Sequence, residues 1–292
     1  MDTRAIIMGL VFALMWSSAF TSARMIVADA PPLTALAIRF LISGLIGVGV
    51  AAALGQSWRL TRGQWRSVVI FGLCQNTLYL GLNFVAMQWI EASLAAIIAS
   101  TMPLLVALLG WLFMGQKVRP LGVAGLFAGM AGVAIIMGSR FSGGLSLEGV
   151  AFCAIGALAL AVATLTVRSA SGQGNVLMVV GLQMFVGAGV LAVAAVVLED
   201  WQVHWTMRLG LAFAYTTLFP GLVATWIWFR LVERIGAVRA ATYHFLNPFF
   251  GVVVAAALLN ERIAMTDIVG VAIVAAGILS VQLSKQVAAP AR

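Results

Sequence analysis

The chain has 292 residues, of which 63% are hydrophobic and 9% are charged. A soluble domain carries about a quarter charged residues because its surface faces water. This composition and a mean hydropathy of +1.08 therefore exclude an ordinary soluble domain. The net charge of +8 does not indicate a nucleic-acid partner, because the basic residues lie in short gaps between apolar runs and form no basic helix.

Ten apolar runs follow one another along the chain, each close to the roughly 20 residues that span a bilayer as a helix. In chain order we expect spans at Ala5–Val27, Leu33–Leu54, Ser67–Met87, Ala92–Met114, Leu121–Ser139, Leu147–Val167, Asn175–Leu198, Leu209–Phe229, Gly236–Leu259 and Met265–Leu283. Turn-forming residues at 30–32, 55–57, 142–144 and 171–174 separate several of them. The first run lacks a small-residue cleavage site and is interpreted as a retained span. The sequence predicts an all-α integral membrane protein with short loops.

The distribution of the 17 basic residues indicates the orientation. If the N-terminus is cytoplasmic, four of them fall on the opposite side and Arg39 lies within the second span. The twelve on the cytoplasmic side are Arg4, Arg59, Arg62, Arg66, Lys117, Arg119, Arg168, Arg230, Arg234, Arg239, Lys285 and Arg292. Because cytoplasmic loops carry an excess of Lys and Arg, we predict that both termini are cytoplasmic, in a bacterial inner membrane.

The two halves of the chain resemble each other at a shift of 145 residues. The segments Ala92–Ala95 and Ala237–Ala240 each precede a proline by eleven residues, and two later glycines of one half match two of the other. We predict two five-span repeats, residues 1–140 and 141–292. A unit with an odd number of spans is followed by an inverted copy, and inverted repeats around a central cavity are typical of secondary transporters.

Pro103 and Pro248 occupy matching positions near the middle of the fourth and ninth spans. A proline inside a helix removes one backbone hydrogen bond and disturbs the preceding turn. We interpret both prolines as flexible joints for gating. The alternative is a static kink that only helps packing.

Several motifs together identify a family. They are Trp16-Ser17-Ser18-Ala19-Phe20, then Pro31-Pro32 and Arg39, and the Ala, Pro and Gly series of spans four, five, nine and ten. Over essentially the whole chain they resemble the EamA-type proteins of the drug/metabolite transporter superfamily. The resemblance implies a ten-helix exporter with two inverted five-helix repeats, most similar to the YddG-like aromatic amino-acid exporters. The chain departs at Gln116, where many relatives have Glu, and at Ser17, where a glycine is common.

Polar residues inside three spans mark the candidate substrate site, because polar groups at membrane depth are costly and face a neighbouring helix or a watery cavity. The third span has a stripe at i, i+3 and i+7, and the ninth has one at i, i+4 and i+8 that begins at Arg239. The predicted substrate-binding residues are Trp16, Ser17, Asn76, Tyr79, Asn83, Tyr243, His244 and Asn247. Tyr and Asn can hold amino and carboxyl groups, and aromatic rings can stack on an apolar side chain.

Each of these residues also has a structural interpretation. Ser, Thr and Asn can join helices by hydrogen bonds, at about 0.6 kcal/mol each. For His244 a proton-linked switch and a simple hydrogen bond are both open. For Arg39 the alternatives are attraction of an anion or carboxylate and a structural role, snorkelling or pairing with carbonyl groups, which we favour. A glycine stripe on the fifth span indicates close helix packing.

The sequence contains neither a Walker motif, nor a metal-ligand cluster, nor a nucleophile elbow, and the middle of every span lacks Asp and Glu. We therefore expect neither an enzyme nor a cofactor. The predicted function is export of small amphipathic metabolites, with aromatic or hydrophobic amino acids as leading substrates, by alternating access. The rivals are a multidrug or nucleotide-sugar carrier of the same superfamily, a membrane-embedded enzyme and a non-transporting scaffold. The expected partners are the substrate and the lipid bilayer, and the oligomeric state, transport direction and driving force stay open.

Overall fold

The computed structural model describes residues 3–115, 119–141, 146–166, 175–235, 240 and 242–286, and the regular elements in these ranges are all helical. The elements are α1 (Thr3–Asp29), α2 (Pro32–Ala53), α3 (Arg62–Phe71), η1 (Gly72–Leu80), α4 (Gly81–Ala86), α5 (Ala92–Ser100), α6 (Met102–Met114), α7 (Pro120–Phe141), α8 (Leu147–Thr166), α9 (Val176–Leu198), α10 (Met207–Leu218), η2 (Phe219–Val223), α11 (Ala224–Ile235), η3 (Thr242–Leu246), α13 (Asn247–Leu259) and α14 (Met265–Gln286).

The predicted spans agree with these helices. In the described ranges, nine helices are long and apolar enough to cross a bilayer, and Tyr243–Leu259 forms a shorter apolar helix. The third span begins at Arg62 rather than at Ser67, because Thr61 and Gln64 form a capping box that starts the helix before its apolar run. The predicted turns at 142–144 and 171–174, together with Gln116 and Arg239, lie outside the described residues.

The chain divides into two compact units. Unit 1 comprises Met1–Thr21, Trp89–Val150 and Val223–Arg292, and unit 2 comprises Ser22–Gln88 and Ala151–Leu222. Neither unit corresponds to one of the predicted sequence repeats, since each contains segments from both halves of the chain.

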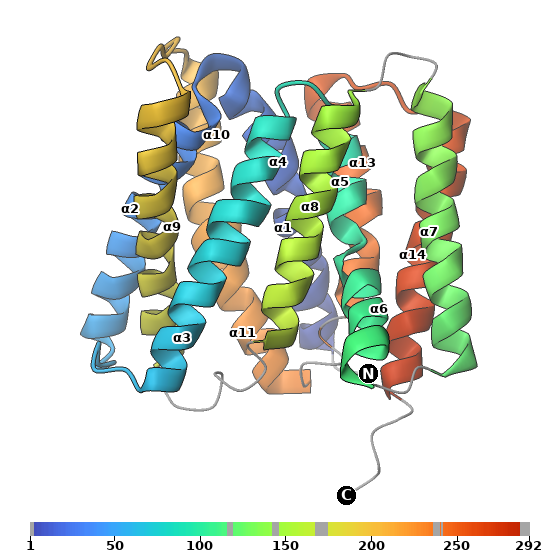
Figure 1. Cartoon of the computed structure of the whole chain (residues 1–292), viewed down its shortest axis with the longest axis horizontal. Helices are drawn as coiled ribbons and strands as arrows, with labels where there is room; N and C mark the ends of the chain where they lie inside the picture. The colour runs from blue at the N-terminus through green and yellow to red at the C-terminus, as the bar shows by residue number, and fades with distance from the viewer. Residues whose placement is uncertain are drawn as a thin grey trace, which may run out of the picture. The chain divides into compact units, whose positions relative to one another are not determined.

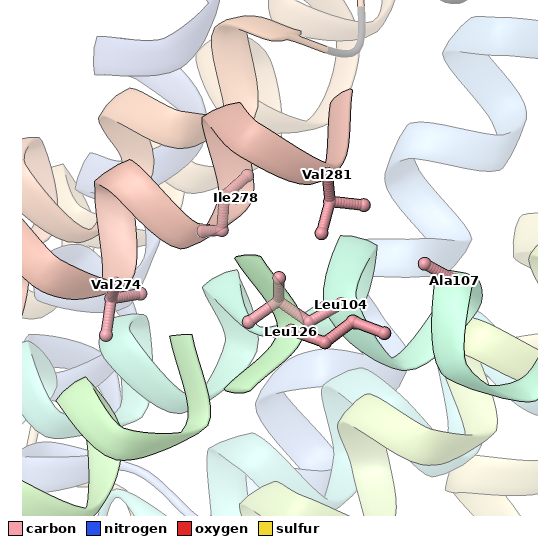
Figure 2. Close-up of a cluster of buried hydrophobic side chains, with 6 residues drawn as sticks. All are labelled: Leu104, Ala107, Leu126, Val274, Ile278 and Val281. Carbon is pink, nitrogen blue, oxygen red and sulfur yellow. The ribbon is translucent and has the colours of Figure 1, made fainter. Parts of the chain in front are cut away.

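In unit 1, α7 and α14 pack side by side (Figure 1). A Cβ added at Gly125 would lie 2.7 Å from the Gly277 carbonyl oxygen, and one added at Gly132 would lie 2.8 Å from the Gly270 carbonyl oxygen. Only glycine allows the two backbones to approach this closely. Beside this contact, α6, α7 and α14 enclose a hydrophobic core, shown in Figure 2, of Leu104, Ala107, Leu126, Val274, Ile278 and Val281.

In unit 2, α2 and α9 pack side by side, again through glycines (Figure 1). The N-terminal end of each helix lies beside the C-terminal end of the other, and a side chain that follows each helix caps the first turn of its partner. The N–H groups of Leu33 and Thr34 donate to the two carboxylate oxygens of Glu199, at 2.6 and 2.8 Å, just after α9 ends. The N–H group of Met178 donates to Gln56 Oε1 at 3.0 Å, just after α2 ends. Both caps satisfy first-turn N–H groups that have no partner within the helix.

These two pairs demonstrate the inversion. The bounds of α7 and α14 are 145 residues apart at both ends, so the two are equivalent helices of the two halves. Their glycine contacts run in opposite sequence order, which means that equivalent helices are antiparallel. The reciprocal caps give the same result for α2 and α9. The structure therefore confirms the inversion that the odd number of spans predicts.

The equivalence extends to irregular turns. The third helix of the first half contains the π-helical stretch η1, and its counterpart in the second half contains η2, which lies within the same range after the 145-residue shift. The bounds of α6 and α13 differ by the same shift. These helices end at left-handed residues in equivalent positions, Gly115 with φ 61° and Asn260 with φ 56°. π-helical turns inside longer helices occur frequently at functional sites.

Candidate functional site

In unit 1, an aromatic cluster surrounds His244. The Phe12 ring centroid lies 5.4 Å from the imidazole, that of Trp228 lies 5.2 Å from it, and that of Trp16 lies 6.5 Å from it. Phe12 also contacts both indole rings, with centroids 5.7 Å from Trp16 and 4.9 Å from Trp228. Phe12 is buried, whereas Trp16 and Trp228 are half-buried. The cluster offers flat apolar faces next to one polar ring.

Asn247 adds directed polar groups to this cluster. Its Nδ2 lies 3.0 Å from His244 Nδ1. Because an amide nitrogen only donates, the imidazole Nδ1 accepts in this pair. Asn247 Oδ1 is buried and has no hydrogen-bond partner among the described residues. An acceptor left in this state costs about 1–3 kcal/mol, and a bound ammonium, amide or hydroxyl group would satisfy it.

Ser17 follows Trp16 on α1 and is 1% exposed. In the described structure its Oγ has no hydrogen-bond partner, and the same holds for Thr21 Oγ1 one turn further along α1. Tyr243 packs its ring against Gly9 of α1, where any side chain would collide with it. Five predicted site residues, Trp16, Ser17, Tyr243, His244 and Asn247, therefore belong to unit 1.

The other three predicted site residues, Asn76, Tyr79 and Asn83, belong to unit 2 and are 2%, 2% and 1% exposed. Asn76 Nδ2 donates to the Gln183 carbonyl oxygen of α9 at 3.0 Å. Asn83 Nδ2 donates to the Tyr79 carbonyl oxygen at 2.7 Å, and its Oδ1 accepts from Cys153 Sγ of α8 at 3.2 Å.

Glycines complete this packing, since Gly187 lies against Asn76 and Gly156 against Asn83 and the Tyr79 backbone. Through these contacts, Asn76, Tyr79 and Asn83 join their helix to neighbouring helices. Substrate contact by Asn76, Tyr79 and Asn83 stays a prediction.

The helix geometry changes just before each of the two predicted hinge prolines. α5 ends at Ser100 and α6 begins at Met102, with Pro103 in its first turn. Likewise η3 ends at Leu246 and α13 begins at Asn247, with Pro248 in its first turn. The second change, from 3₁₀ to α geometry, lies between His244 and Asn247, so a backbone movement there would alter their pairing. Whether the prolines act in gating is not tested by this geometry and stays a prediction.

Sequence reasoning missed Phe12 and Trp228, although Phe12 precedes Trp16 by one helical turn. It also missed the role of Glu261, whose carboxylate oxygens accept from the N–H groups of Ala92 at 2.8 Å and Ser93 at 3.1 Å. Glu261 thus caps α5, where the helix dipole favours a negative charge. Within the described residues, no group of three or more His, Cys, Asp or Glu side chains could hold a metal ion.

Comparisons with known proteins identify the family. The EamA-like transporter family matches the chain twice, at residues 3–138 and 147–283. The chain belongs to the EamA-like transporter family. It is accordingly a multi-pass membrane transporter of small molecules rather than an enzyme.

Relatives in several organisms are named as transporters. The chain is 26% identical over 277 residues to the uncharacterized transporter YvbV of Bacillus subtilis (strain 168), covering 94% of this chain and 90% of the relative. It is 29% identical to the aromatic amino acid exporter YddG of Ancylobacter novellus over 139 residues, 48% of each chain. A crystal structure of a protein with 21% sequence identity matches 99% of this chain with a TM-score of 0.70, covers 100% of that protein and shows the same fold.

Proposed function

We propose that this protein exports small amphipathic metabolites across the bacterial inner membrane by alternating access, with aromatic or other hydrophobic amino acids as its leading substrates. Both termini face the cytoplasm in this proposal, as the basic residues predict. The observation that supports the substrate class best is the unit 1 cluster, in which the unpartnered Asn247 Oδ1 lies next to the aromatic rings around His244.

The chemistry of this cluster suits an amphipathic molecule. Asn247 Oδ1 would accept from an ammonium group, and Ser17 Oγ would donate to or accept from a second polar atom. The rings of Trp16, Phe12 and Trp228 would contact an apolar or aromatic side chain. The name of one relative, an aromatic amino acid exporter that matches half of the chain, favours the same substrate class.

The antiparallel equivalent helices support alternating access. In transporters with inverted repeats, exchanging the conformations of the two repeats opens the site to the opposite side. The changes in helix geometry before Pro103 and Pro248 occupy matching positions in the two halves. We propose them as the joints at which the backbone changes, because a proline lacks the N–H group that would bond to the preceding turn.

Counterflow in proteoliposomes tests this proposal. Vesicles with the purified protein would be loaded with one unlabelled amino acid and diluted into its labelled form, with and without a pH gradient. We expect accumulation of labelled phenylalanine, tryptophan or leucine above empty vesicles. Accumulation of a nucleotide sugar or a cationic drug, and of no amino acid, would refute the substrate assignment. Dependence on the pH gradient would establish proton coupling.

A pair of matched variants tests the site itself. Ser17→Ala and Thr266→Val each remove a hydroxyl group that is buried and unpartnered in the described structure. Ser17 belongs to the proposed site, whereas Thr266 lies at the start of α14. We expect slower transport only for Ser17→Ala, at unchanged expression and thermal stability. Equal rates for the two variants would remove Ser17 from the site.

A further inference from the structure

Arg39 of α2 is a buried cation to which none of the described residues offers a counter-charge. It is the eighth residue of the helix, about 10 Å from its N-terminal end at 1.5 Å per residue, and it is 6% exposed. Its Nε is buried without a hydrogen-bond partner, and in the part of the chain that the structure describes no carboxylate forms an ion pair with the guanidinium group. Its resolved interaction is with the Phe40 ring, whose centroid lies 5.4 Å from Cζ.

Such a group is costly at membrane depth. A charged side chain at the centre of a span disfavours insertion by about 2.5–3.5 kcal/mol, and buried charges in membrane proteins are usually paired. Arg24 of the same unit follows this rule, because its guanidinium donates to the Met87 carbonyl oxygen. Arg39 therefore retains unused capacity to bind an anion.

A second unpartnered polar group lies beside Arg39. Ser43, one turn further along α2, is 1% exposed, and its Oγ has no partner among the described residues. The two groups meet at Gly221 of η2. A Cβ added there would lie 3.6 Å from Arg39 Nη2, 3.6 Å from Ser43 Oγ and 3.3 Å from the Thr216 carbonyl oxygen.

The position equivalent to Gly221 in the first half of the chain carries a side chain. Gly221 corresponds to Asn76 by the 145-residue shift, and both lie in π-helical stretches that pack near a second-span helix or its equivalent. The Asn76 side chain fills its position and donates to the Gln183 carbonyl oxygen at 3.0 Å. Gly221 leaves the corresponding place without a side chain, next to Arg39 Nη2 and the Ser43 hydroxyl group.

We propose that Arg39, Ser43 and the Gly221 turn of η2 form a binding site for one monovalent anionic group, such as a carboxylate. The planar guanidinium group matches a carboxylate with two parallel hydrogen bonds, and a serine hydroxyl adds a third donor. The single cation favours one negative charge over two. A free carboxylic acid, an inorganic anion and a lipid headgroup could each supply such a charge.

The proposal concerns unit 2 alone and does not depend on which substrate the transporter moves. A direct binding experiment therefore tests it separately from transport. Wild-type protein in phosphatidylcholine nanodiscs would be titrated with phenylacetate and with its uncharged analogue phenylacetamide. Thermal unfolding, followed by the fluorescence of the nine tryptophans, reports binding because a ligand of the folded state raises the midpoint.

We expect phenylacetate to stabilise the protein more than phenylacetamide does. Arg39→Gln and Gly221→Ala should weaken phenylacetate binding about tenfold or more, because one removes the charge and the other places a methyl group 3.6 Å from both Nη2 and Oγ. Arg208→Gln and Gly210→Ala are matched controls and should bind normally, since Arg208 is exposed and a Cβ at Gly210 meets nothing within 4 Å. If Arg39→Gln fails to fold, Gly221→Ala still decides the question.

Two further arms distinguish the source of the anion. Stabilisation by chloride that is lost in both variants supports the site with an inorganic occupant. Stabilisation in phosphatidylglycerol nanodiscs with the same dependence supports it with a lipid headgroup as occupant. The proposal is overturned if phenylacetate, chloride and phosphatidylglycerol all fail to stabilise the wild type, or if their effects are unchanged in Arg39→Gln and Gly221→Ala.

Discussion

Replacing Gly277 with alanine tests the contact between α7 and α14. The added Cβ would lie 2.6 Å from the Gly125 carbonyl oxygen and 2.6 Å from the Gly129 amide nitrogen. Both neighbours are backbone atoms and cannot rotate away, so the helices must separate by roughly 0.8 Å to restore ordinary contact. Such overpacking costs about 1–3 kcal/mol. Alanine returns about 1 kcal/mol of helix propensity, which leaves a net loss of about 0–2 kcal/mol.

Gly138→Ala is the matched control, because a Cβ at this position of α7 meets nothing within 4 Å. It gains the propensity without the collision and should be up to about 1 kcal/mol more stable than the wild type. Thermal unfolding of purified protein in detergent would rank the Gly277→Ala variant lowest and the Gly138→Ala variant highest. The packing argument is refuted if Gly277→Ala is as stable as Gly138→Ala.

Three further predictions concern single side chains. Asn247→Leu should raise the KM for transport roughly ten- to hundredfold, because a hydrogen bond to a charged group contributes about 1.5–3 kcal/mol; an unchanged KM in proteoliposomes would contradict the site. Asn83→Leu should lower thermal stability, since Cys153 Sγ and the Tyr79 carbonyl oxygen both lose their partner, and a melting point equal to the wild type would dismiss this role. Glu261→Ala should lose about 1–2 kcal/mol by removing the α5 cap, whereas Glu261→Gln, which keeps one acceptor, should lose about half as much in the same melt; equal losses would count against the cap.

Hydropathy was enough to predict the helices because lipid permits few alternatives. A span needs about 20 apolar residues with all backbone groups bonded internally. Apolar runs of that length can therefore be recognised in the sequence as spans. The boundary error at Arg62 has a local cause, since polar residues continue the helix beyond the bilayer once Thr61 caps it. The inversion was equally accessible, because it follows from counting five spans in each repeat.

The side-chain environments were not accessible in the same way. The stripe at Asn76, Tyr79 and Asn83 shows that these residues share a helix face, yet periodicity cannot tell a cavity from a neighbouring helix. In the structure, Gln183 and Cys153 of other helices contact this stripe. For the same reason, sequence periodicity did not identify Phe12 and Trp228, which lie far apart in the sequence and meet at His244.

Arg39 is a residue for which sequence context favoured a structural role that the structure does not show. Its sequence context favoured a structural role, in which a carbonyl or headgroup pairs with the charge. Among the described residues, the guanidinium Nε has no hydrogen-bond partner, and neither has Ser43 Oγ one turn further along α2. That arrangement depends on a glycine 182 residues away in sequence, Gly221, which no local pattern reveals.

The claim on which the account depends is that the site at Ser17 and Asn247 is reached from each side of the membrane in turn. Its most direct measurement is the labelling of Ser17→Cys by an impermeant thiol reagent, added separately to each side, in a protein whose two native cysteines are replaced by serine. We predict labelling from both sides, with protection by the substrate found in counterflow. Labelling from one side alone under every condition would contradict alternating access at this site.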